Sequence, residues 1–142
     1  MPGFLQPAEL KEISAETEAA KVDEHELFKR KQEEVKRELR NAFMAREVHP
    51  EVIERVNNAV TIAARLGSRQ IEVVTFPCSY CSDGGRRINN QLPDWPTSLE
   101  GFAKKAYEFY ERELKPLGFK ATAQVVSYEG GVPGQVTMFL KW

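Results

Sequence analysis

The chain has little of what secreted, membrane-spanning or metal-dependent proteins are usually built from. Its 142 residues include only two cysteines and two histidines. No run of about 18 apolar residues occurs, which excludes a membrane-spanning helix. The N-terminal MPGFLQPAELKEISAE has neither a basic start nor an apolar stretch, so we expect no signal peptide and a cytoplasmic protein. Two cysteines in such a chain indicate free thiols or metal ligands rather than a structural disulfide.

A strong excess of charge of either sign is also absent. Twenty Lys and Arg residues stand against 21 Asp and Glu residues, for a net charge of -1. This balance argues against broad nucleic-acid binding, which depends on a basic surface and counterion release. Catalytic patterns are scarce as well, since no Ser-His-Asp spacing and no HExxH motif occurs. A non-enzymatic role is therefore the leading interpretation, and an enzymatic one stays open.

The composition divides the chain into three regions that we expect to form one compact domain overall. Residues 1–13 contain two prolines and a glycine and predict a loose tail. Residues 14–66 predict a helical N-terminal region, since residues 14–48 lack Pro and Gly and are rich in strong helix formers. Ser14 is a plausible N-cap for the first helix. Residues 67–142 predict an α+β C-terminal module.

The first predicted helix has too few apolar residues to belong to a core. Phe28, Val35 and Ala42 lie seven residues apart, but the apolar stripe is narrow. A helix of this kind is only partly stable alone, so we expect it to dock on its own domain or on another chain. The sequence thus favours a homo-oligomer or a protein partner bound through the N-terminal helix.

A second helix should follow His49 and Pro50, because proline is favoured at the first helical position. Its apolar residues fall on one face, and Gly67 supplies a stop. The two helices would form a helical hairpin or a single helix kinked at Pro50.

The C-terminal module reads as strand, helix, strand, strand. Residues 70–76 (QIEVVTF) predict a buried strand, and FKATAQVVSY and QVTMFLKW predict a hairpin joined by EGGVPG. Between them, Thr97 and Glu100 fit the capping box of a helix that Pro116 and Gly118 would end. The predicted fold class is α+β, with the N-terminal helices followed by a two-layer β-α-β-β unit and a three-stranded sheet.

The segment after the first strand, FPCSYCSDGGRRINN, holds both cysteines. Cys78 and Cys81 have the CxxC spacing of a zinc or redox pair. A closed zinc site needs about four ligands, and only His25, His49 and carboxylates such as Asp83 remain to complete one. A redox role would place the first cysteine at a helix N-terminus, which Ser-Asp-Gly-Gly does not favour. Metal binding, a disulfide and plain packing all stay open.

The second half of this segment predicts a binding loop for a small anion. Adjacent glycines let backbone N–H groups converge on an anion, and two neighbouring arginines can grip a carboxylate or phosphate. The same pattern is ordinary turn chemistry. The candidate ligand-binding residues are Asp83, Gly84, Gly85, Arg86, Arg87 and Asn89.

The strings CSDGGRRINN, DWP, ELKPLGF and a terminal FLKW resemble a family of small uncharacterised bacterial proteins. The resemblance covers roughly the last 65 residues, from Cys81 onward. It implies that the C-terminal part is a natural module of a bacterial cytoplasmic protein, and it implies no catalytic residue.

Two functions follow as hypotheses. The first is a non-enzymatic module that interacts with a partner or with a second copy of itself through its N-terminal helix. The alternative is binding of a small anionic ligand or of zinc at the Cys78–Arg87 loop.

Overall fold

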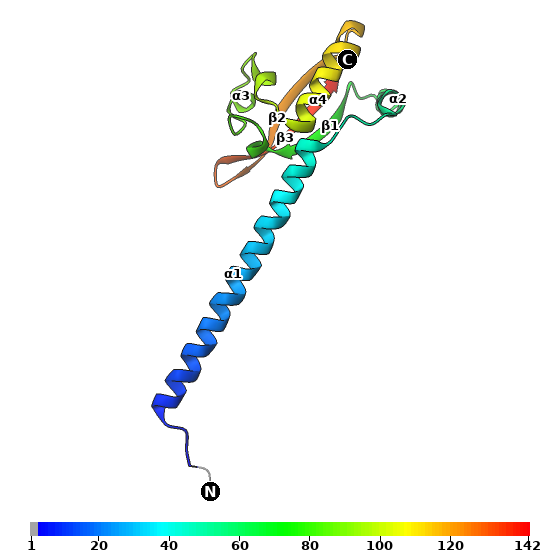
Figure 1. Cartoon of the computed structure of the whole chain (residues 1–142). Coiled ribbons are helices and arrows are strands. Elements are labelled where there is room, and N and C mark those ends of the chain that lie inside the picture. Colours follow the sequence, from blue (N-terminus) through cyan, green and yellow to red (C-terminus); the bar gives the residue numbers. More distant parts are fainter. Residues whose placement is uncertain (1–2) are drawn as a thin grey trace. The chain divides into compact units, whose positions relative to one another are not determined.

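The computed structural model describes residues 3–142 (Figure 1). Contacts divide the chain into two compact units, Met1–Asn41 and Ala42–Trp142. The second unit includes the second helix as well as the α+β module expected from residue 67 onward, because that helix packs with the sheet. Within residues 3–142, no helix has the length and apolar character needed to cross a membrane.

The first unit consists mainly of helix α1, which runs from Pro7 to Ala45 and continues into the second unit. The predicted start at Ser14 was wrong, since residues 7–13 of the expected tail are helical. Pro7 occupies the first helical position, where its missing N–H is not needed. The N–H of Gln6 donates to Glu9 Oε2 at 3.2 Å, which closes the first turn. None of the 39 residues of α1 is buried.

Helix α2, Val52–Arg65, is separate from α1, so the alternative of one kinked helix was wrong. Residues 46–51 break the helical path, and the N–H of Glu51 donates to His49 Nδ1 at 3.0 Å. The N–H of Val52 donates to the carbonyl of His49 and opens the new helix. Gly67 ends it with a φ of 81°, as its position predicted. Helix α2 packs against the first strand.

The predicted three-stranded sheet is confirmed, and with it the α+β fold class. Strand β1 (Gln70–Pro77) and strand β2 (Lys120–Glu129) flank the central strand β3 (Val132–Lys141), and both pairings are antiparallel. The register pairs Phe76 and Val125 with Val136. Each edge strand carries an irregularity, between Glu72 and Val74 in β1 and after Val125 in β2.

The predicted capping box was wrong. Helix α4 begins at Gly101 rather than after Thr97, and Glu100 precedes it without a side-chain cap. The Thr97 hydroxyl instead donates to the carbonyl of Asp94 at 2.7 Å within a short 3₁₀ helix, Trp95–Ser98. Helix α4 ends at Phe109, a π-helical turn and a 3₁₀ turn follow, and Gly118 stops the run with a φ of 100°.

The core of the second unit lies between α4, the cysteine loop and one face of the sheet (Figure 1). Phe43, in the last turns of α1, packs its ring against those of Phe76, Tyr80 and Phe102, with centroids 4.9–6.1 Å apart. The last turn of α1 approaches the start of α4 so closely that a side chain at Gly101 would lie 2.7 Å from the Cα of Met44. The most deeply buried residues are Phe76, Cys78, Ile88, Ser98, Ala103, Val136 and Leu140.

Candidate functional site

Both cysteines of the CxxC motif are buried free thiols that belong to the core. Cys78 opens a short 3₁₀ helix, Cys78–Tyr80, and the N–H of Cys81 donates to the Cys78 carbonyl at 3.0 Å. Cys78 is 2% exposed and Cys81 5%. Burial raises the pKa of both thiols, and the charge of Asp83 helps to raise that of Cys81 to about 12. At neutral pH both groups are therefore protonated, which is the form that packs rather than the form that attacks or binds metal.

The described part of the chain, residues 3–142, contains no cluster of three or more His, Cys, Asp or Glu side chains able to hold a metal ion. His49, a candidate third ligand, accepts a hydrogen bond from the N–H of Glu51 through Nδ1. Zinc binding at Cys78 and Cys81 stays a prediction, and it would require both thiols to lose their protons and gain two further ligands.

The glycine pair does form the strongly turned backbone that the sequence predicted. Gly84 and Gly85 have φ values of 69° and 88°, and Gly85 leads directly into the short helix α3, Arg86–Asn89. Space as well as backbone conformation restricts Gly85, since a Cβ there would lie 3.1 Å from the Cβ of Cys78. The loop and the cysteines are thus packed as one unit.

The anion held by this turn is the side chain of Asp83 itself. Its Oδ1 accepts the N–H of Gly85 at 2.9 Å, and its Oδ2 accepts the N–H of Arg87 at 3.0 Å. The Arg87 guanidinium adds a charged hydrogen bond at 3.2 Å from Nη1 and reaches Asp94 Oδ2 at 3.1 Å through Nε. An external phosphate or carboxylate would have to displace Asp83 from these donors. Binding of such a ligand here stays a prediction.

The electrostatics of Asp83 match this role. Burial alone would raise the pKa of its carboxyl group, but the N–H groups of Arg87 and Gly85 and the Arg87 charge outweigh it and lower the pKa. Asp83 is therefore ionised at neutral pH, and its side chain is 12% exposed. The loop contains a satisfied internal ion pair.

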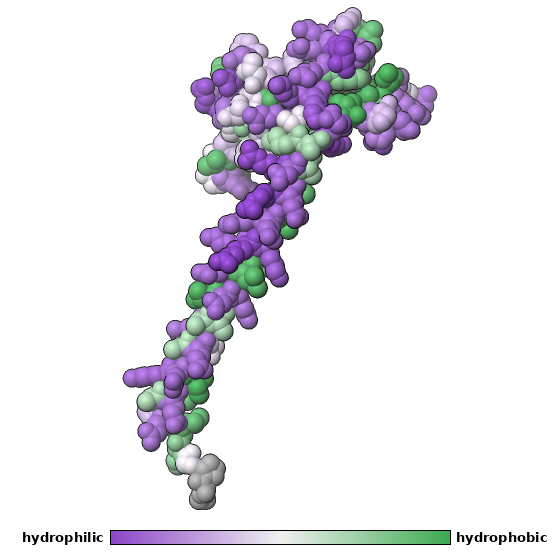
Figure 2. All heavy atoms as spheres, in the orientation of Figure 1, coloured by the Kyte–Doolittle hydropathy of each residue, from purple (hydrophilic) through white to green (hydrophobic). Residues whose placement is uncertain are grey.

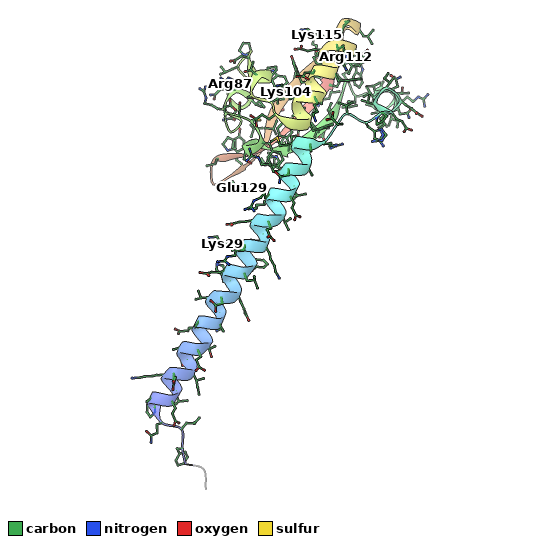
Figure 3. All side chains as sticks on the ribbon, viewed as in Figure 1. Lys29, Arg87, Lys104, Arg112, Lys115 and Glu129 are labelled. Atoms are coloured by element: carbon green, nitrogen blue, oxygen red, sulfur yellow. The ribbon has the colours of Figure 1, made fainter. Side chains whose placement is uncertain are left out.

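The remaining loop residues are arranged less tightly. Arg86 and Gly84 are exposed, and Asn89 accepts a hydrogen bond at Oδ1 from the Tyr128 hydroxyl at 2.8 Å. That contact ties α3 to strand β2. Figure 3 shows Arg87 on α3 within the second unit. The structure therefore brings together Asp83, Gly85 and Arg87, while Arg86 takes no part in the cluster.

A cavity that the sequence did not predict lies in the second unit between α2, α4 and the sheet. It has a volume of about 240 Å³. Three alanines on different elements, Ala59, Ala106 and Ala121, line it, and their small side chains leave the space unfilled. Larger apolar residues complete the wall: Val48, Val52, Val56, Ile71, Val73, Phe102, Phe109, Tyr110, Leu114, Met138, Phe139 and Leu140.

Basic residues also border the cavity. Arg46, His49 and Arg55 contribute to its lining and are exposed, so they lie where it meets solvent. The Arg46 guanidinium stands 4.0 Å from the centre of the Phe102 ring, a cation–π contact. Glu72 is an acidic member of the lining. An apolar interior with basic groups at its mouth is suited to a small molecule that has an apolar body and an acidic group.

Comparisons with known proteins do not assign this arrangement. No protein-family model matches the chain, and searches of the curated proteins and of the solved structures find no similar protein. The family resemblance of the C-terminal motifs accordingly stays a prediction.

Proposed function

We propose that the protein is a self-associating module whose assembly surface lies on helix α1. The observation that carries this proposal is that a 39-residue helix has no buried residue, although apolar side chains recur along it. Figure 2 shows the hydrophobic residues as separate patches on a mostly hydrophilic helix. Most helices in proteins derive their stability from packing an amphipathic face, and α1 has no such packing within residues 7–41.

The apolar side chains of α1 form a stripe, hereafter the α1 stripe. At roughly 100° per residue its members fall within an arc of about 100° around the helix. They are about half exposed or more, Phe28 being the most exposed at 60%. Val22, 56% exposed, lies on the opposite side of the helix. The large members of the stripe are Leu10, Ile13, Leu27, Phe28 and Val35, and Leu39, 61% exposed, lies about 20° beyond its edge.

Sedimentation equilibrium on the full chain tests this proposal. We expect a concentration-dependent dimer for the natural sequence. Replacing Leu27 and Phe28 with glutamine removes the burial of two large side chains, each worth about 1.5–3 kcal/mol. The dissociation constant should therefore rise at least about 100-fold in L27Q/F28Q.

Val22→Gln is the matched control, since it makes the same chemical change on the same helix outside the stripe. Its dissociation constant should equal that of the natural chain. If the natural chain stays monomeric at every concentration, self-association is contradicted. The α1 stripe would then bind a different protein. Equal weakening by V22Q and L27Q/F28Q contradicts the assignment of the surface.

A second candidate function is binding of a small carboxylic acid with an apolar body in the cavity. The cavity of about 240 Å³ exceeds the roughly 150 Å³ of an engineered apolar cavity that admits benzene. Arg46 and Arg55 supply positive charge at its border. Octanoate should raise the melting temperature, and octylamine, with the same chain and opposite charge, should not.

Ala59→Leu places extra carbons in the cavity and should abolish the octanoate shift. Ala64→Leu makes the same change at an exposed position of α2 outside the cavity and should retain it. An octanoate shift that survives in A59L, or no shift in the natural chain, rules out this second function.

A further inference from the structure

The charges of helix α1 are segregated along its length. Residues 7–27 contain seven acidic and two basic side chains, a net charge of -5. Residues 28–41 contain six basic and three acidic side chains, a net charge of +3. Lys29, in the basic half, projects from the helix surface in Figure 3. The first unit is therefore a helix with an acidic half and a basic half.

The helix dipole does not explain this segregation. The dipole favours acidic groups only within about the first turn of a helix and basic groups only within the last. Asp23, Glu24 and Glu26 lie near the middle of α1, several turns from either end, and so do Lys29 and Arg30. A pattern that extends over the whole helix calls for a partner surface of similar length.

We infer that the partner is a second copy of α1 bound antiparallel, an inference that rests on the proposed self-association. In an antiparallel pair the acidic half of each helix lies beside the basic half of the other, along the full contact. In a parallel pair the two acidic halves would lie together, and so would the two basic halves. Complementary charge fixes orientation in helix pairs in this way, since like charges placed side by side oppose association.

The α1 stripe also fixes a register. Between Leu10 and Val35 two charged residues of opposite sign interrupt it, Glu24 and Lys31, at positions three or four residues from Leu27 and Phe28. When a twofold axis passes between Leu27 and Phe28, each residue faces the partner residue for which the two residue numbers add up to 55. Glu24 then faces the partner's Lys31, and Leu27 faces the partner's Phe28. A twofold interface makes each of these contacts twice.

The same axis places Ala20 against the partner's Val35, a small residue against a larger one. In a parallel, in-register pair Glu24 would face the partner's Glu24, and Lys31 the partner's Lys31, both repulsive. The two charged interruptions of the stripe thus neutralise each other only in the antiparallel arrangement. Charged residues on such a seam are a known means of selecting one register over others.

Disulfide trapping in the full chain tests the orientation. Two variants are prepared, Ala20→Cys and Val35→Cys, one of them with a mass tag, and are oxidised mildly alone and after mixing. Cys78 and Cys81 are retained in both variants, because both thiols are buried and have raised pKa values. We expect a rapid cross-link between A20C and V35C in the mixture.

Neither variant should cross-link to itself. In the antiparallel register the two copies of residue 20 are separated by fifteen residues, about 22 Å along the axis. A disulfide requires Cα atoms within about 7 Å. Rapid self-linking of A20C and of V35C overturns the antiparallel inference while self-association stands. A dimer in which no pair cross-links overturns the register, whereas a chain that is monomeric in sedimentation refutes the proposed function itself.

A charge exchange supplies an independent readout of the same contact. Glu24→Lys or Lys31→Glu alone places like charges together twice in the dimer, and each should raise the dissociation constant about tenfold or more. The double variant E24K/K31E restores opposite charges and should return to within about threefold of the natural chain. Additive weakening in the double variant contradicts the contact. The two residues are seven apart in the helix, outside the three- and four-residue spacings of pairs within one helix, so the rescue does not arise within one chain.

Discussion

The clearest stability prediction concerns Asp83, because three hydrogen bonds end on its carboxylate. Asp83→Ala leaves the N–H groups of Gly85 and Arg87 without their acceptor. A buried unsatisfied donor costs about 1–3 kcal/mol, and Gly85 is buried while Arg87 is only partly so. We therefore expect a loss of about 2 kcal/mol in the free energy of unfolding. For a unit of this size that lowers the melting temperature by roughly 10 °C.

The assay is thermal and urea unfolding of the full chain followed by circular dichroism, with Asp94→Ala as the control. Asp94 contacts the same arginine, but its side chain is 58% exposed, so its removal should cost no more than about 0.5 kcal/mol. Equal losses in D83A and D94A would show that the Arg87 charge, and not the backbone donors, stabilises the loop. That result would contradict the role assigned here to the N–H groups of Gly85 and Arg87.

The pH dependence of the same contact has a definite sign. The pKa of Asp83 is lowered in the folded protein. Its contribution to folding stability is therefore complete above the unfolded pKa of 3.8, and it is lost as the pH falls through the lower folded pKa. The stability gap between the natural chain and Asp83→Asn should therefore be constant near neutral pH and should narrow below about pH 4. A gap that widens on acidification contradicts the assignment.

Three further predictions follow from the packing of the second unit. Gly101→Ala should lower the free energy of unfolding by about 3 kcal/mol, because Gly101 has a φ of 58° and an added Cβ would lie 2.7 Å from the Met44 Cα. Gly118→Ala, which has open space around it, should lower the same free energy by only about 1 kcal/mol. Phe43→Ala removes a ring that contacts three others and should cost about 3 kcal/mol by urea titration, so a loss below 1 kcal/mol contradicts this packing. Cys81 should react with iodoacetamide at pH 8 only as fast as the protein unfolds, because burial raises its pKa to about 12. The contribution of the protonated thiol to folding stability should be lost as the pH rises above about 9.

The sequence predicts the elements of the second unit well, because their signals are local. The apolar face of α2, the stop at Gly67 and the alternation of β3 are each decided by residues close together in the chain. The start of α4 was missed because the Thr97 hydroxyl suits two positions equally well, an N-cap paired with Glu100 and a turn of the 3₁₀ helix Trp95–Ser98, which ends before Glu100. Only the surrounding packing distinguishes the two.

The candidate sites depend on contacts that the sequence leaves open. The Asp-Gly-Gly turn at residues 83–85 was predicted to hold an anion, and the pattern is the same whether the anion is a ligand or the neighbouring aspartate. The cavity was missed because Ala59, Ala106 and Ala121 meet only after the sheet and both helices have assembled. The segregation of charge along α1, in contrast, is visible in the sequence. It indicates a partner surface only once the structure shows that α1 has no buried residue.

We propose that helix α1 brings two copies of the chain together. Sedimentation equilibrium of the natural chain, from about 1 to 300 μM, is the measurement for this, since dissociation constants in that range correspond to binding free energies of about −8 to −5 kcal/mol. We expect a mass that rises from that of one chain to that of two, and a rise that is shifted to far higher concentration in L27Q/F28Q. A mass of one chain across the whole range would contradict it.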